Sequence, residues 1–374
     1  MGKKEENRTF RVLYLLAIFF VVDGHIPLEG ELMNFGGLFR YYSFHMMLFA
    51  FGSGYFFDSG RSFKDAVLRD CRHLLVPLYV YNLLYGLLAA SLRKGLGMTL
   101  GEPLSLYTIL AAPVLDGQHF AYNLGAWFIG ALFLLKMIYR CLYSLLRRFP
   151  APDISAFILS LLAGFAAVTL CRRGPVSAGF LPVCRALILL PGYSLGALYR
   201  ERLEKLDRCP SVPYLTVLVL LRLIFTTAVP ENAYLISNLS YFPCGPAALY
   251  LGSFLAIAFY LRIARILSPL LERSRILLFA SRNTFDIMMH HGLGILMLNG
   301  IFLMLNRFHL GAAEFSVHQF RTAQGYVYAP HGAPEWAVLY VLAGVAAGLC
   351  VAFVREWLKG KIRNRTNGRS GIFG

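Results

Sequence analysis

The first apolar segment ends with an aspartate and a histidine, two side chains that can take part in acid–base catalysis. Asp23 and His25 follow the run LYLLAIFF, within VVDGHIPLEG at residues 21–30. Ionisable side chains are costly inside a membrane and mark functional sites there, and histidine suits proton transfer near neutral pH. Helix positions i and i+2 point in different directions, so Asp23 can orient His25 only if Gly24 and Pro27 open the helix. An interfacial polar cap is the alternative interpretation.

A second histidine lies at the start of the next apolar segment, YYSFHMMLFAFGSGYFF, residues 41–57. On consecutive antiparallel helices, His45 and His25 would lie at similar depth, where both could line one cavity. Near the other end of this segment, Ser53 and Gly54 are small enough for a neighbouring helix to approach closely. Plain packing is the alternative to a binding role for these two residues.

Two arginines lie three positions apart in VLRDCRHLLVP, residues 67–77. On a helix, Arg69 and Arg72 would share a face, and guanidinium groups bind phosphate oxygens in pairs. A phosphate clamp is therefore one interpretation, and a basic loop that sets membrane topology is the other. Pro77 then marks the start of the third apolar helix.

Three more ionisable residues lie inside the apolar segment SRNTFDIMMHHGLG, residues 281–294. Asp286 and His290 are four positions apart, so they share a helix face and could form a hydrogen-bonded pair. His291 follows directly. A metal site would need three or more ligands, and we expect no metal here. Trp127, at the outer start of the fourth apolar segment, is either part of an aromatic belt or a substrate contact.

Membrane-spanning helices must position these residues. The 374-residue chain is 57% hydrophobic and only 15% charged, against roughly 25% charged residues in soluble domains. Its apolar runs suit a hydrocarbon core of ~30 Å. We predict an all-α polytopic bundle forming a single membrane domain over residues 1–374, with a basic cytoplasmic tail at 355–374. The helices are predicted at residues 11–28, 41–57, 74–92, 123–140, 154–171, 180–199, 211–229, 244–264, 283–304 and 335–354.

The net charge of +16 would suggest nucleic acid in a soluble protein. Here most of the 36 Lys and Arg fall in the two tails and in alternate loops, so the positive-inside rule places both termini in the cytoplasm. We expect contacts with membrane lipid and none with nucleic acid. The seven cysteines show no C-x-x-C pair. They are predicted to be packing residues, with an outer disulfide left open.

Several of these segments, in this order over about residues 20–300, resemble the acyltransferase-3 family of membrane proteins, and within it the fucose-acetylase-like O-acetyltransferases. They are VVDGH, SFHMMLFAFGSGYFF, the R-x-x-R segment before LLVPLYVY, WFIGALF, LPGYSLGALY and SRNTFDIMMHH. The resemblance implies a ten-helix bundle that moves an acyl group, usually acetyl, from cytosolic acyl-CoA to a hydroxyl. The implied acceptor is a sugar of a cell-envelope glycan or its lipid-linked precursor. Acetyl-CoA would be a co-substrate, with no tightly bound cofactor, and the location would be a bacterial cytoplasmic membrane.

The resemblance also implies roles for single residues. The essential histidine of the first helix maps to His25, and the R-x-x-R pair maps to Arg69 and Arg72. The histidine of the late motif maps to His290, rather than its neighbour, by its spacing from Asn283. Phe44-His45-Met46 matches the F-H-M element of the family, which makes His45 a further candidate in the catalytic site.

The chain departs from the family pattern at three positions. The family usually has a basic residue eleven positions before the histidine, where this chain has Tyr14, and Arg11 is the nearest basic substitute. Met47 replaces the usual proline after F-H-M, and Asp23 is a less usual residue before Gly-His. The departures raise the chance of an unusual acceptor or a non-catalytic member.

The resulting hypothesis is an acyltransferase with His25 as general base and Asp23 as its orienting partner. Acyl-CoA would bind at the arginine pair, with Arg11, Ser53 and Tyr55 completing its site. Trp127, His290 and Asn283 would contact the acceptor. Two other classes remain open: a transporter or flippase that uses the same polar cavity, and a non-catalytic sensor or scaffold.

Overall fold

All regular secondary structure in the described residues is helical. The structure is a computed structural model that describes residues 7–28, 37–116, 120–123, 125–174, 176–177, 179–230 and 245–369, with the backbone alone at residue 272 and at 362–369. Residues 370–374 of the predicted basic tail and Cys244 lie outside the described residues. The six described cysteines are free thiols.

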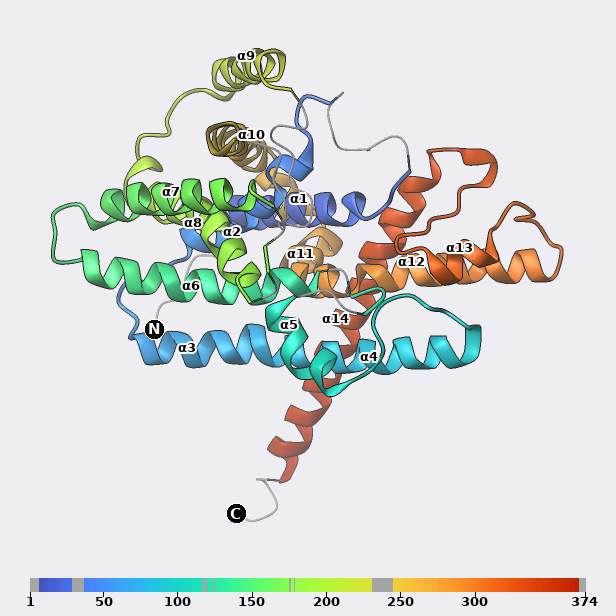
Figure 1. The fold of residues 1–374 in the computed structure, drawn as a ribbon. Helices are drawn as coiled ribbons and strands as arrows, with labels where there is room; N and C mark the ends of the chain where they lie inside the picture. Colours follow the sequence, from blue (N-terminus) through green and yellow to red (C-terminus); the bar gives the residue numbers. More distant parts are fainter. Residues whose placement is uncertain are drawn as a thin grey trace.

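Each of the ten predicted helices has a counterpart in the structure (Figure 1). Eight helical segments in the described chain are long and apolar enough to cross a membrane, whereas α1 and α2 fall short of that length. The protein is therefore an all-α polytopic membrane protein. The ten helices are α1 (Arg8–Gly24), α2 (His45–Tyr55), α4 (Val76–Leu96), α6 (Ala126–Leu146), α7 (Pro152–Cys171), α8 (Leu181–Leu198), α9 (Ser211–Ala228), α10 (Pro246–Arg273), α12 (Thr284–Arg307) and α14 (Trp336–Arg369).

The third predicted helix begins earlier than expected. Helix α3 (Phe63–Asp70), the π turn η2 (Cys71–Leu75) and α4 form one helical segment, which Ser62 caps by accepting a hydrogen bond from the amide of residue 65. Pro77 lies inside this segment rather than at its start. A proline has no amide proton for the carbonyl four residues earlier, and the wider π turn is a common way for a helix to absorb such a defect.

The chain between the predicted helices at 244–264 and 283–304 divides between two helices. Helix α10 continues to Arg273, and after Ser274 the short helix α11 (Arg275–Arg282) follows. Helix α14 likewise runs past its predicted end at residue 354. The α10 extension is rich in Arg and Leu and the α14 extension in Arg and Lys, which are good helix formers.

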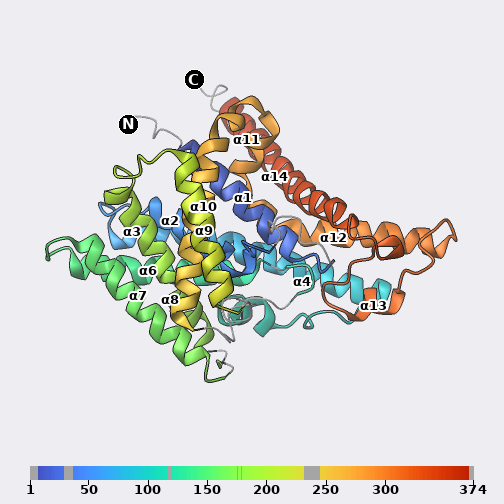
Figure 2. The same ribbon diagram turned by 90° about the horizontal axis from the view of Figure 1, so that it is seen from above.

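Helix α1 is central to the bundle, where it contacts α2, α10, α12 and α14, while α9 lies at the edge against α10 (Figures 1 and 2). Helices α2 and α8 approach through glycines. A Cβ atom on Gly54 would lie 1.8 Å from the Tyr193 carbonyl oxygen, and one on Gly196 would lie 2.0 Å from the Phe51 carbonyl oxygen. The close approach expected from the small residues of the second helix is therefore present.

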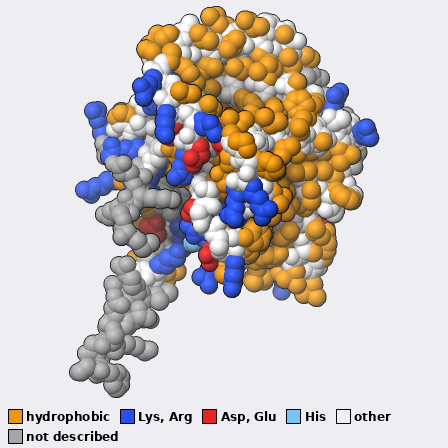
Figure 3. Space-filling view, turned by 90° about the vertical axis from the view of Figure 1, so that its left-hand side faces the viewer, with side chains coloured by type: hydrophobic (Ala, Val, Ile, Leu, Met, Phe, Trp, Pro, Cys, Tyr) orange, Lys and Arg blue, Asp and Glu red, His pale blue; other side chains and the backbone are white. Residues whose placement is uncertain are grey.

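The start of α1 and the end of α14 lie on the same side of the bundle (Figure 2). Figure 3 views the left-hand side of Figure 1, where Lys and Arg side chains gather in one region and hydrophobic side chains cover much of the remaining surface. This distribution agrees with the positive-inside rule. We call this side the cytoplasmic side and the opposite one the outer side.

Candidate active site

His25 follows the last residue of α1 and is half-buried. Its Nδ1 lies 2.7 Å from the carbonyl oxygen of Val21, one turn earlier. A carbonyl oxygen can only accept, so Nδ1 carries the proton of the neutral imidazole and Nε2 keeps its lone pair. The hydroxyl of Tyr42 donates a hydrogen bond to the carbonyl of Gly24, which ties the end of α1 to the start of the α2 region. The backbone thus presents Nε2 of His25 as the basic atom.

Two histidines from other helices lie near His25. The ring of His291, on α12, is centred 4.8 Å from the His25 ring. His45, the first residue of α2, lies with its ring 5.6 Å from that of Tyr42, whose hydroxyl binds the Gly24 carbonyl next to His25. The Nδ1 atoms of His291 and His45 lie 2.8 Å from the Met288 carbonyl and 2.6 Å from the Tyr41 carbonyl, respectively. The same reasoning therefore leaves Nε2 as the acceptor atom in all three rings. We call His25, His45 and His291 the histidine cluster.

Asp23 does not orient His25. Helix α1 stays regular through Gly24, so the side chains of residues 23 and 25 point in different directions. The backbone carbonyl of Val21 fixes the tautomer, which is the role predicted for the carboxylate. Asp23 is buried at the end of α1. Its predicted role as the orienting partner of His25 is therefore wrong.

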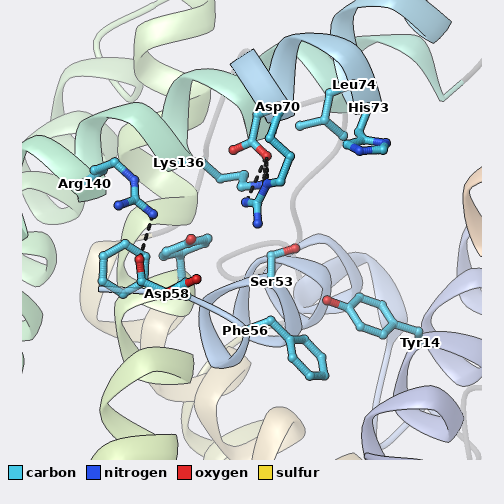
Figure 4. A pocket seen from close by; sticks show the side chains of 12 residues that line it. Tyr14, Ser53, Phe56, Asp58, Asp70, His73, Leu74, Lys136 and Arg140 are labelled. Carbon is cyan, nitrogen blue, oxygen red and sulfur yellow. Dashed lines mark hydrogen bonds and ion pairs between the residues drawn. The ribbon is translucent and has the colours of Figure 1, made fainter. Parts of the chain in front are cut away.

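A cavity of about 310 Å³ lies near the cytoplasmic side, between α1, α2, α3, η2, α6 and α8 (Figure 4). Its wall combines cations, two carboxylates, two hydroxyl-bearing side chains from α1 and α2, and aromatic rings. The lining residues are Tyr14, Ser53, Phe56, Phe57, Asp58, Arg69, Asp70, His73, Leu74, Lys136, Arg140 and Tyr193. Such a wall can hold an anionic ligand that also has an apolar part.

Asp70 organises the cations of this cavity. Its Oδ1 accepts from Nε and Nη2 of Arg69, both at 3.0 Å, and from Nζ of Lys136 at 2.8 Å. One turn further along α6, Arg140 donates to the backbone carbonyls of Arg61 and Asp58, at 2.7 and 3.0 Å. Arg140 thereby holds the loop between α2 and α3, which forms one edge of the cavity (Figure 4).

The predicted arginine pair does not form one clamp. Arg69 lines the cavity, whereas Arg72 is exposed and lies outside the lining. The π turn begins at Cys71, between the two arginines. A π turn changes the angular step per residue, so the shared face expected for an α-helix is lost. Ser53 does line the cavity, as predicted for a donor-site residue.

Two other residues predicted for the donor site lie elsewhere. Tyr55 accepts from the Asn7 amide at 2.8 Å and donates to the Glu204 carboxylate, and its ring stacks on Phe10. It therefore joins α1, α2 and the turn after α8. Arg11 lies on the first turn of α1, close to Arg282. Neither side chain belongs to the cavity lining.

The polar residues of the late motif form a separate network between α4, α12 and α14. Arg355 binds the Asp286 carboxylate at 2.7 Å and the Asn283 side-chain oxygen at 2.9 Å. Nδ1 of His290 lies 3.0 Å from the Tyr85 hydroxyl. The predicted pairing of Asp286 with His290 is therefore wrong, because α14 supplies an arginine that binds the carboxylate more strongly.

The two neighbouring histidines of α12 face different helices. His290 faces the tyrosines of α4, with the Tyr81 ring 4.4 Å away, and its neighbour His291 lies beside His25. Contact of His290 and Asn283 with an acceptor stays a prediction. Trp127, half-buried at the outer start of α6, packs against the Arg185 guanidinium at 5.0 Å, and its contact with substrate also stays a prediction.

The cavity and the histidine cluster lie at two depths of the same helices. Tyr14 lines the cavity and His25 follows the end of α1, so the two residues are eleven positions apart, which is about 16 Å at ~1.5 Å per residue. In the described chain, no group of three or more His, Cys, Asp or Glu could hold a metal ion. The arrangement can therefore bind an anion at the cytoplasmic side and remove a proton nearer the outer side.

Sequence reasoning missed His291, Lys136, Asp70 and Arg140. Lys136 gave the clearest signal, because a lone lysine inside an apolar span is costly and needs a reason. Asp70 stands between the two arginines, where a buried carboxylate would have been a natural counter-ion. The spacing of residues along α12 could not show whether His290 or His291 faces His25. That choice depends on how α12 is rotated about its axis, which is a property of the packed bundle.

Comparison with known families gives one match, and it covers nearly the whole chain. Residues 10–356 match the family Acyl_transf_3, described as an acyltransferase domain. Comparisons with curated proteins and with solved structures returned no match. The matched range contains both the histidine cluster and the cation-lined cavity. The protein therefore belongs to the acyltransferase-3 family of membrane acyltransferases.

Proposed function

We propose that the protein moves an acetyl group from cytosolic acetyl-CoA to a hydroxyl of a cell-envelope or exported glycan, or of its lipid-linked precursor. The observation that carries the proposal is the pairing of a cation-lined cavity on the cytoplasmic side with a cluster of basic nitrogens nearer the outer side. Donor and acceptor then approach from opposite faces, with the helices α1 and α2 running between the two sites. In this reading the protein is a multi-pass protein of a bacterial cytoplasmic membrane.

The donor site follows from the cavity. The phosphates of acetyl-CoA carry several negative charges, and Arg69 supplies guanidinium donors suited to phosphate oxygens. The pantetheine arm is a flexible chain that continues past Tyr14 and Ser53, whose hydroxyl groups point into the same space (Figure 4). The thioester then reaches His25 about 16 Å further along α1.

The chemistry needs one base and no redox step. Nε2 of His25 takes the proton of the acceptor hydroxyl while the hydroxyl oxygen attacks the thioester carbonyl carbon. The carbon–sulfur bond then breaks, and the thiolate of CoA takes the proton back from the imidazolium. The products are the ester and free CoA. A positioned base of this kind contributes ~10²–10⁴-fold to the rate, and direct transfer requires no covalent acyl-histidine.

The test is release of CoA and acetylation of the glycan by the full-length protein. We expect His25→Ala to lower kcat by ~10²–10⁴-fold while acetyl-CoA still binds. The matched control is His318→Ala, which removes an exposed histidine on the short helix α13 (Val317–Thr322). Full glycan acetylation by His25→Ala would show that the base is assigned to the wrong residue. Lack of CoA release by the wild type with any envelope glycan would instead favour a flippase or a scaffold.

A further inference from the structure

One carboxylate in the cavity wall holds two cations at once. The Asp70 side chain is only 4% exposed, and its Oδ1 binds both Arg69 and Lys136 within 3.0 Å (Figure 4). Lys136 lies in the middle of α6, a helix whose other residues are mostly apolar. A charge at such a position is stable only with a partner. Asp70 is the carboxylate that the structure pairs with this lysine.

Asp70 offsets only part of the positive charge. Arg69 and Arg140 both lie close enough to Lys136 to repel its ammonium group, so the three cations need a counter-charge to remain together. The other carboxylate of the lining, Asp58, pairs with Arg61, which lies outside the lining, and it also attracts Arg140. Two carboxylates beside these three cations leave a net positive charge facing the cavity.

Donor groups remain on both cations after Asp70 is satisfied. An ammonium group has three N–H donors and a guanidinium has five, and Asp70 takes one from Lys136 and two from Arg69. The two side chains are partly open, with 18% of Lys136 and 34% of Arg69 exposed. The arrangement presents two positive heads side by side, as a phosphate group requires.

We propose that Lys136 is a phosphate-binding residue of the donor site, and that Asp70 is a positioning residue which holds the heads of Lys136 and Arg69 side by side. This proposal rests on the proposed function, because it takes acetyl-CoA as the ligand. In place of the expected pair of Arg69 and Arg72, the phosphate binds Arg69 from α3 and Lys136 from α6. The ligand group is a phosphate of the nucleotide end of the donor, which pantetheine lacks.

The experiment measures equilibrium binding of coenzyme A and of pantetheine to the purified full-length protein. We expect Lys136→Met to weaken binding of coenzyme A by about tenfold, the size of one hydrogen bond between charged groups, and to leave binding of pantetheine unchanged. Asp70→Asn should have the same effect because the heads of Lys136 and Arg69 are then no longer held side by side, and Asp70→Glu should restore part of the affinity. A merely structural role of Asp70 would weaken both ligands equally and would overturn the proposal.

Two exposed residues of α3 provide matched controls. Lys64→Met and Asp65→Asn remove the same charges outside the cavity and should bind coenzyme A as the wild type does. If Asp70→Asn fails to fold because Lys136 is left unpaired, the double variant with Lys136→Met removes both charges. The double variant should fold and bind coenzyme A as weakly as Lys136→Met alone.

The outcomes separate this proposal from the proposed function. If the wild type binds coenzyme A and all cavity variants bind it equally well, Lys136 and Asp70 have no such role, whatever the protein transfers. If the variants behave as expected but no acetyl group reaches a glycan, the donor site stands and the acceptor assignment fails. If the wild type does not bind coenzyme A, both proposals are wrong.

Discussion

At the scale of single residues, backbone carbonyls determine which ring nitrogen of each histidine in the cluster is basic. His25, His45 and His291 each direct Nδ1 to a carbonyl oxygen three or four residues earlier on their own chain segment. No carboxylate is needed to select the tautomer, which is the role that the sequence suggested for Asp23. This leaves the lone pairs on Nε2, the atoms furthest from the backbone, to meet a substrate hydroxyl.

Substitution of His290 and of His291 in turn tests which of these two neighbours assists the base. His291→Ala should lower kcat about tenfold or more, because its ring lies 4.8 Å from that of His25 and losing a neighbour that positions the base removes part of the ~10²–10⁴-fold that a positioned base contributes. His290→Ala should lower kcat less, because that ring faces Tyr81 and Tyr85. The measurement is kcat for acetyl transfer by the two variants side by side. A larger loss in His290→Ala would restore the residue that family spacing selects.

The positions within one helix were predictable from the sequence, and the partners on other helices were not. His25 and Arg69 follow from the end of an apolar run and from a basic stretch before the next one. Their partners His291 and Lys136 depend on how α12 and α6 are rotated about their own axes. That rotation results from packing many side chains at once, which the period of one segment does not report.

At the scale of elements, the contact between α2 and α8 depends on glycine. We expect Gly54→Ala to lower the free energy of unfolding by about 1–3 kcal/mol, because the new methyl group would overlap the Tyr193 carbonyl and force the helices apart. Gly95→Ala is the matched control, since nothing lies within 4 Å of a Cβ atom at that position of α4. Thermal unfolding in detergent measures both. Equal stability of the two variants would mean that the helices are packed less closely than described.

Element boundaries show the same limit of sequence reasoning. The ten apolar runs predicted ten helices in the right order, because length and hydropathy are local properties. The π turn at Cys71–Leu75 was not predictable from the same runs, although Pro77 marks its cause. Its effect on the site is large, because it separates Arg72 from the cavity that Arg69 enters.

At the scale of the whole molecule, the mechanism requires that the two sites face opposite compartments. The described Lys and Arg side chains gather on the left-hand side of Figure 1 (Figure 3), and the positive-inside rule assigns that side to the cytoplasm. Acetyl-CoA is a cytosolic donor, so the sidedness of the cavity decides whether the donor can reach it. The orientation of the bundle is therefore part of the mechanism rather than a separate property.

This orientation predicts which surface residues a reagent can reach from outside the cell. In a variant without native cysteines, Glu314→Cys in the exposed connection after α12 should react with a membrane-impermeant maleimide on intact cells. Lys205→Cys, in the exposed connection after α8, should react only after the membrane is opened. The opposite pattern would place the cation-lined cavity outside, where cytosolic acetyl-CoA cannot enter. The basic surface would then have to serve another anionic ligand, and His25 would face the cytoplasm.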